Sequence, residues 1–158
     1  MSHLPVHTIE TAPEASKPAL QGAVKAFGFL PNLTATFAES PAMVEAYGVL
    51  AGHFEKTALT PTERQIVLIT TSRENGCTYC MAAHSTVSEM QKVPADVIDA
   101  LRNDTPIADP KLQALQVFTA RIHETRGNVT EADLEAFQSA GYTKANILDV
   151  ILGAGLKT

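Results

Sequence analysis

The segment around positions 60–72 constrains the fold of this chain most strongly. It begins with Thr60-Pro61-Thr62-Glu63, in which Thr60 can cap a helix, Pro61 fits the first helical position and Glu63 completes a capping box. The residues that follow are apolar on nearly all sides after the first turn. Such a helix belongs in the centre of a fold or in a subunit interface. The β-branched run is also compatible with a buried strand, but the length and the capping box favour a helix.

Helix signals recur along the rest of the chain and predict an all-α single domain, a helical bundle over residues 13–158 preceded by an arm over 1–12. Capping residues or proline begin most of the segments, and glycine ends several of them. The last helix has no C-cap signal, which is consistent with a helix cut short. The predicted helices span about 13–27, 33–38, 41–55, 61–74, 77–91, 94–101, 110–126, 131–139 and 144–158.

Charge and hydropathy narrow the possible partners. Charged residues make up 18% of the 158 residues, below the roughly 25% of typical soluble domains, so we expect a partner subunit to cover part of the surface. The net charge is -5 and Lys and Arg do not cluster, which argues against nucleic-acid and anionic-membrane partners. Because the sequence has no signal peptide pattern and no apolar run of about 18 residues, we expect a cytoplasmic protein.

Two cysteines and a histidine carry the chemistry that the sequence indicates. They lie in Asn75-Gly76-Cys77-Thr78-Tyr79-Cys80-Met81-Ala82-Ala83-His84, at the predicted start of a helix. A CxxC in this place puts both sulfurs on one face, near enough for a disulfide, and the helix dipole favours thiolates. His84 follows Cys80 by one turn and leans back over it, whereas Cys77 is two turns away. The spacing predicts Cys80 as the nucleophile and Cys77 as its resolving partner, although the dipole alone favours Cys77.

Other interpretations of these side chains remain open. Cys77, Cys80 and His84 could supply three zinc ligands, although no second CxxC or HxxxH motif supplies a fourth. The cysteines could also be passive buried thiols, because free cysteine packs as a small hydrophobic residue. His53 and His123 could line a pocket, but each is interpreted as a surface or interface residue.

The segments Thr60–Val67 and Asn75–His84 together resemble the alkylhydroperoxidase D core, the thiol-bearing branch of the carboxymuconolactone decarboxylase superfamily. The segments 30–32 and 94–101 resemble its peroxidase-related members. The resemblance implies an all-helical homo-oligomer, a dimer and in some members a hexamer. It also implies reduction of hydroperoxides, with an external dithiol or lipoyl-type donor as reductant. In this pattern Cys80 attacks the peroxide, Cys77 resolves the product and His84 is the base of a proton relay. The sequence itself has no Gly-rich phosphate loop and no haem ligand pattern, so we expect no cofactor.

The chain departs from the family pattern in the relay. A carboxylate is expected twelve residues before Cys77, where this chain has Gln65. Glutamine can orient His84 by hydrogen bonding but cannot take up a proton. Glu63 should point away from the site, because it lies two residues from position 65 and belongs to the capping box. Glu74 is a candidate substitute, although a surface charge is its commoner role.

The second residue between the cysteines is a second departure from the family pattern. It is a histidine in some members, whereas in this chain it is Tyr79. The departures keep two alternatives to a peroxidase open. One is a lyase like carboxymuconolactone decarboxylase, although such relatives generally lack the CxxC. The other is a redox-sensing or structural oligomer with little turnover.

Overall fold

The computed structural model describes residues 3–157, so residues 1–2 of the predicted arm and residue 158 of the last predicted helix lie outside it. Within this range the chain is helical and contains no strand, which confirms the predicted fold class. The chain divides into two compact units, of which the first ends at Gly52 and the second begins at His53. The single domain after a short arm stays a prediction.

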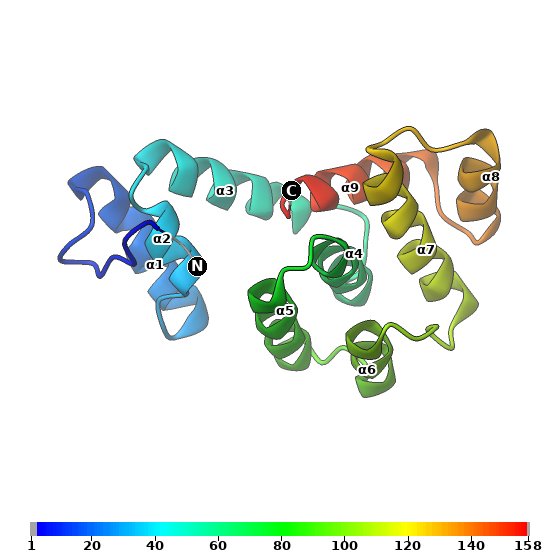
Figure 1. Cartoon of the computed structure of the whole chain (residues 1–158), viewed down its shortest axis with the longest axis horizontal. Coiled ribbons are helices and arrows are strands. Elements are labelled where there is room, and N and C mark those ends of the chain that lie inside the picture. The colour runs from blue at the N-terminus through cyan, green and yellow to red at the C-terminus, as the bar shows by residue number, and fades with distance from the viewer. Residues whose placement is uncertain (1–2, 158) are drawn as a thin grey trace. The chain divides into compact units, whose positions relative to one another are not determined.

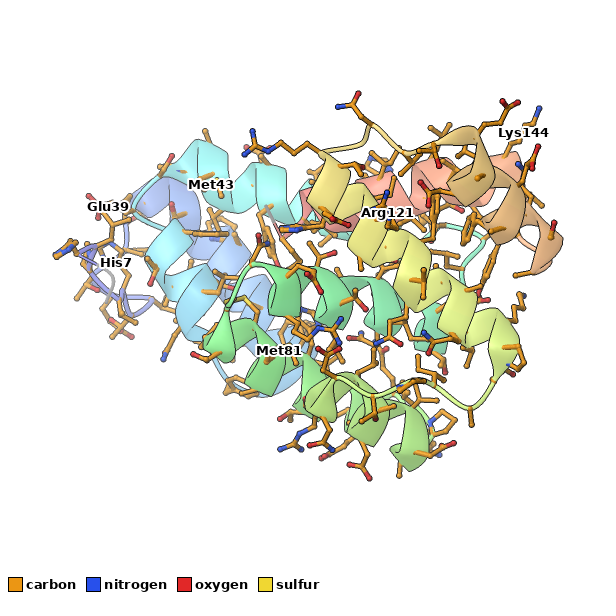
Figure 2. All side chains as sticks on the ribbon, turned by 45° about the vertical axis from the view of Figure 1, so that its right-hand side comes forward. His7, Glu39, Met43, Met81, Arg121 and Lys144 are labelled. Atoms are coloured by element: carbon orange, nitrogen blue, oxygen red, sulfur yellow. A yellow bond between two sulfur atoms is a disulfide. The ribbon has the colours of Figure 1, made fainter. Side chains whose placement is uncertain are left out.

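The first unit holds the 3-10 turn η1 (Glu14–Ser16), the helices α1 (Lys17–Phe27) and α2 (Asn32–Phe37), and most of α3 (Pro41–Phe54). The segment before η1 packs onto α2, where the His7 backbone N–H donates to the Ala35 carbonyl at 3.3 Å. The His7 ring also bonds Glu39 at 2.7 Å, and the two side chains are labelled beside each other in Figure 2. A small core lies beneath, formed by Ala12, Leu20 and Ala38 with Ile9 and Leu30 against them.

The predicted helix over 13–27 begins later than expected. Its α-helical part starts at Lys17, after the short 3-10 turn. The cause is Pro18, which has no backbone N–H to donate and is therefore accommodated in the first turn of a helix rather than in its interior. The predicted end is correct, because Gly28 adopts a left-handed φ of 79° and caps α1.

The second unit is arranged around α4 (Pro61–Glu74), which contacts four other helices and lies between them in Figure 1. The predicted capping box is present, because the Thr60 N–H donates to Glu63 at 2.8 Å and the Glu63 N–H donates to Thr60 at 3.2 Å. The helix, not the alternative strand, is therefore confirmed. The surrounding helices, with α8 packed on α7, are α5 (Thr78–Met90), α6 (Ala95–Asn103), α7 (Pro110–Thr125), α8 (Glu131–Ser139) and α9 (Lys144–Gly155).

The apolar helix α4 lies in the centre of the second unit, not in a subunit interface. Every residue from Glu63 to Ser72 is buried within this single chain. A helix that its own chain covers needs no partner subunit, so it gives no support to an oligomer. The predicted oligomer then depends on the low charge content and on the resemblance alone.

The last helix is shorter than predicted, because α9 ends at Gly155 and not at residue 158. The backbone tightens there, with Leu156 N–H donating to Gly153 and Lys157 N–H donating to Ala154. A side chain from another part of the unit completes the end, since the Asn75 amide donates to the Lys157 carbonyl at 2.6 Å. This distant partner gives no local sequence signal.

Gly153 allows α9 to lie close to the core, and we expect its substitution to destabilise the fold. A Cβ at this position would lie 2.5 Å from Phe54 and 2.7 Å from Val67. Gly153→Ala should lower the free energy of unfolding by about 1–3 kcal/mol through overpacking, measured by urea denaturation. Gly155→Ala on the same helix is the control, because no atom lies within 4 Å of a Cβ there. Equal stability of the two variants would contradict this packing.

Candidate active site

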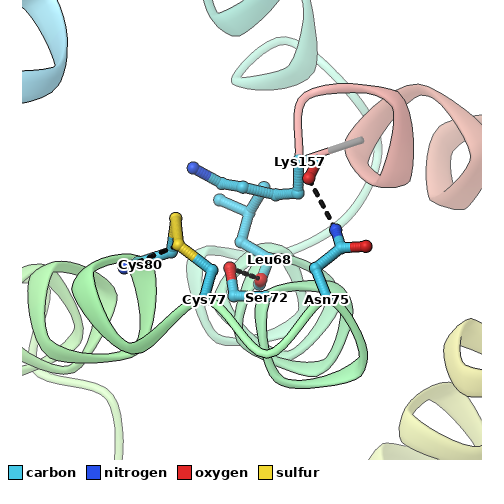
Figure 3. Close-up of a disulfide and its surroundings, with 6 residues drawn as sticks. All are labelled: Leu68, Ser72, Asn75, Cys77, Cys80 and Lys157. Carbon is cyan, nitrogen blue, oxygen red and sulfur yellow. Dashed lines mark hydrogen bonds between the residues drawn. A yellow bond between two sulfur atoms is a disulfide. The ribbon is translucent and has the colours of Figure 1, made fainter. Parts of the chain in front are cut away.

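Cys77 and Cys80 lie where α4 ends and α5 begins, and they are joined as a disulfide (Figure 3). Gly76 makes the sharp turn between the two helices with a left-handed φ of 64°. Cys77 is the N-cap of α5, and its sulfur accepts the Cys80 backbone N–H at 3.2 Å. The predicted CxxC at a helix N-terminus is therefore confirmed, with the Cα atoms 5.3 Å apart.

His84 is held by a chain of side-chain amides. Its Nδ1 lies 3.0 Å from the Gln65 carbonyl oxygen, and the Gln65 amide nitrogen donates to the Gln91 carbonyl oxygen at 3.1 Å. Since a carbonyl oxygen can only accept, Nδ1 of His84 carries the proton. The neutral imidazole then has its lone pair on Nε2, the nitrogen that can take up a proton.

The surroundings keep the His84 ring neutral. Burial, followed by the positive charge of Lys157, lowers the pKa of His84 to about 3. Within the part of the chain that the structure describes, no carboxylate contributes to this shift. The neutral imidazole has a lone pair that can receive a proton, but a pKa this low makes the protonated form costly. No carboxylate at position 65 stabilises that form.

Lys157 reaches the site from the segment after α9. Figure 3 shows its side chain extending past Leu68 toward the disulfide, while its carbonyl is held by Asn75. The Asn75 side-chain oxygen lies 2.8 Å from Nε2 of His123 on α7, so one amide joins α7 to the end of the chain. Burial lowers the pKa of Lys157 to about 8.

The structure also shows where the remaining predicted residues lie. Glu63 is buried in its capping box and bonds Lys111 at 3.3 Å, so it is engaged elsewhere, as expected. Glu74 binds Arg73 at 3.0 Å, consistent with a surface charge. Tyr79 is 43% exposed and His53 is also exposed.

Sequence reasoning missed Gln91 and Lys157. Gln91 had a usable signal, because it follows His84 by seven residues, two helical turns, and so continues the same face. Lys157 had none, since only the packing of the second unit brings its side chain to the cysteines. The bond of His123 to Asn75 is a second contact without a local signal in the sequence.

Over residues 3–157, no group of three or more His, Cys, Asp or Glu side chains is arranged to hold a metal ion. Nor does any helix of that range have the length and apolar character needed to cross a membrane.

Comparison with protein families gives one match. The sequence model described as the carboxymuconolactone decarboxylase family matches residues 35–120, which include α4, α5 and both cysteines. A search of curated proteins gave no significant match.

Solved structures share the fold over nearly the whole chain. A peroxidase-related protein from Ralstonia eutropha JMP134, described as an alkylhydroperoxidase AhpD core, is 25% identical with a TM-score of 0.84, covering 99% of this chain and 84% of its own. A peroxidase-related protein from Silicibacter sp. TM1040 is 19% identical with a TM-score of 0.81, covering 98% and 82%. The debrominase Bmp8, in its C82A form with 2,3,4-tribromopyrrole, is 15% identical with a TM-score of 0.81, covering 99% and 84%.

Proposed function

The chain belongs to the carboxymuconolactone decarboxylase family, and from that premise we propose that it is a thiol-dependent peroxidase that reduces alkyl hydroperoxides. The observation that carries this proposal is the Cys77–Cys80 disulfide at the start of α5, with His84 one turn further along the same helix. A lyase has no need of a pair of cysteines that can form and break a disulfide, whereas a peroxidase does.

The first half of the proposed reaction oxidises Cys80. Its thiol gives a proton to Nε2 of His84, and the thiolate attacks one peroxide oxygen. The O–O bond breaks, and the leaving alkoxide takes the proton from His84 and departs as an alcohol. Cys80 is left as a sulfenic acid. The bond from Nδ1 of His84 to Gln65 supports this role, because it leaves the Nε2 lone pair for the proton.

The second half restores the site. The Cys77 sulfur attacks the Cys80 sulfur, the disulfide forms and water leaves. An external dithiol, such as a lipoyl-type donor, then reduces the disulfide by thiol–disulfide exchange and is itself oxidised to a disulfide. One hydroperoxide and one dithiol thus give one alcohol, one water and one new disulfide.

We extend the proposal to the protein's surroundings. Its partners are the hydroperoxide and the dithiol donor, without nucleic acid or membrane, and its compartment is the cytoplasm. The low charged fraction of 18% supports a homo-oligomer, and the family resemblance supports a dimer or a hexamer.

The test is a thiol titration of the reduced protein before and after one equivalent of an alkyl hydroperoxide. The proposal requires both thiols to disappear and both to return with a dithiol, with continuous peroxide consumption when the donor is in excess. Unchanged thiols would contradict it and favour a structural oligomer. Decarboxylation of a carboxymuconolactone by the protein with both cysteines alkylated would favour the lyase. Because a structural neighbour is named a debrominase, a bromopyrrole should also be tested as a substrate.

A further inference from the structure

The thiolate that the proposed reaction needs has no evident cationic partner in the relay. An imidazolium at His84 would serve, but Gln65 is neutral and His84 is held in its neutral form. A buried or half-buried thiolate without a positive neighbour is costly, because burial disfavours the charged form. The α5 N-terminus contributes only a partial positive charge.

A cation is nevertheless present at the site. The Lys157 side chain extends toward the disulfide in Figure 3. Its charge reaches His84, which lies one turn from Cys80, because it contributes to the lowered pKa of that ring. The ammonium group therefore acts electrostatically on the imidazole, and its side chain extends toward the cysteines in Figure 3.

The backbone of Lys157 is held by a side chain next to the cysteines. The Asn75 amide donates to the Lys157 carbonyl at 2.6 Å, and Asn75 directly precedes the Gly76-Cys77 turn. The same Asn75 side chain is bonded to His123 at 2.8 Å. The turn that carries the cysteines thus holds the backbone of the residue whose side chain faces them.

We propose that the Lys157 ammonium group is the counter-ion of the Cys80 thiolate in the reduced protein. This inference rests on the proposed function, and it assigns to Lys157 the charge that a carboxylate-supported imidazolium would otherwise supply. His84 then only relays the thiol proton, to water in the resting protein and to the alkoxide during turnover, and Lys157 stabilises the charge that remains on sulfur.

The charge balance sets the pH range of the effect. Burial lowers the pKa of Lys157 to about 8 with the disulfide present, so the ammonium form dominates at neutral pH. A thiolate formed on reduction has the opposite charge and raises that pKa, which strengthens the pair. Two other charged or titratable groups of this region have partners of their own: Glu74 binds Arg73 and His123 binds Asn75.

The test uses no peroxide, so its result is independent of the proposed activity. The absorbance of the thiolate at 240 nm is followed against pH for the reduced wild type and for Lys157→Met. We expect the pKa of the more acidic thiol to rise by about one unit in Lys157→Met. Lys157→Arg should retain the low value, since a guanidinium stays charged over the whole range. A wild-type titration curve in Lys157→Met would overturn the proposal.

The control variant is Lys144→Met at the other end of α9. Lys144 is exposed, and in Figure 2 it lies far from Met81, the residue after Cys80. Lys144 is the first of the twelve residues of α9, a helix about 18 Å long, which is well beyond a Debye length at physiological salt. The thiol pKa of the Lys144→Met variant should equal that of the wild type. An equal shift in both lysine variants would mean a general charge effect and would contradict a specific counter-ion.

The reduction potential gives a second readout that a merely structural role would not move. A residue that stabilises the thiolate favours the reduced form, so its loss should favour the disulfide. We expect up to a tenfold change in the dithiol–disulfide equilibrium constant of Lys157→Met, which is about 30 mV. If the wild type is inert to peroxide but Lys157→Met shows the shifts in thiol pKa and reduction potential, the proposed peroxidase activity is overturned and the counter-ion role is not. If the wild type is active and Lys157→Met shows neither shift, the counter-ion role alone is overturned.

Discussion

Cys80→Ser is expected to be inert toward hydroperoxide, with a rate roughly a thousand-fold or more below that of the wild type. A serine hydroxyl cannot form the anion that attacks the O–O bond, and His84 lies one turn from position 80, two turns from position 77. Cys77→Ser should still react once and stop at a sulfenic acid on Cys80. The measurement is the single-turnover rate together with dimedone trapping and mass spectrometry of each reduced variant.

Cys77 is the competing candidate for the attacking cysteine, and the two serine variants distinguish it from Cys80. The Cys77 sulfur accepts the Cys80 backbone N–H at 3.2 Å, and this bond stabilises a thiolate on Cys77 as the helix dipole does. Wild-type reactivity in Cys80→Ser, with the adduct on Cys77, would show that the helix N-terminus outweighs His84 and Lys157. Loss of reaction in Cys80→Ser alone would show the reverse.

The helices were predictable because their signals are local. The Thr60–Glu63 capping box, Gly76 in the left-handed region and the Asp109-Pro110 start lie within a few residues of the ends that they set. The ends that were wrong had non-local or competing causes. Pro18 moved the start of α1, and the bond from Asn75 accompanies the early end of α9.

The candidate site likewise contains residues that local spacing predicts and residues that only the packing brings together. Cys77, Cys80 and His84 share one helix face, so their proximity follows from spacing. Gln65 lies on another helix, and the resemblance placed it at His84, where the hydrogen bond is found. Lys157 could not be found from sequence, because 73 positions separate it from His84 (157 against 84) and no pattern links them. The roles of these residues in a reaction stay predictions.

The amide at position 65 leads to the second large expected effect. Gln65 is 2% exposed and its oxygen faces Nδ1 of His84, so Gln65→Glu places a carboxylate directly against the ring. A nearby opposite charge shifts a pKa by about one to three units, so the pKa of His84 should rise from about 3. Because imidazolium is then easier to form, the thiolate–imidazolium pair should be favoured and the reaction with peroxide should be faster.

The size and pH range of this gain follow from burial. General acid–base assistance is usually worth about 10²–10⁴ in rate, so we expect an increase of about tenfold or more from a relay that gains its carboxylate. Burial raises the pKa of a carboxyl, so the gain should appear toward the upper part of a pH 5–9 range, where the new glutamate is ionised. The measurements are the second-order rate constant for peroxide across that range and an NMR titration of the His84 ring.

Gln91→Glu is the matched control, because it adds the same charge one hydrogen bond further from His84. Gln91 contacts Gln65 at 3.1 Å, not the ring. Its glutamate can still accept the Gln65 N–H, so the amide chain survives, whereas in Gln65→Glu the Gln91 amide must turn to donate its own N–H to the new carboxylate. A gain in Gln65→Glu well above that in Gln91→Glu identifies direct contact with His84 as the cause. An unchanged rate and pH profile in Gln65→Glu would mean that the relay does not run through position 65, and that Lys157 and the neutral imidazole already suffice.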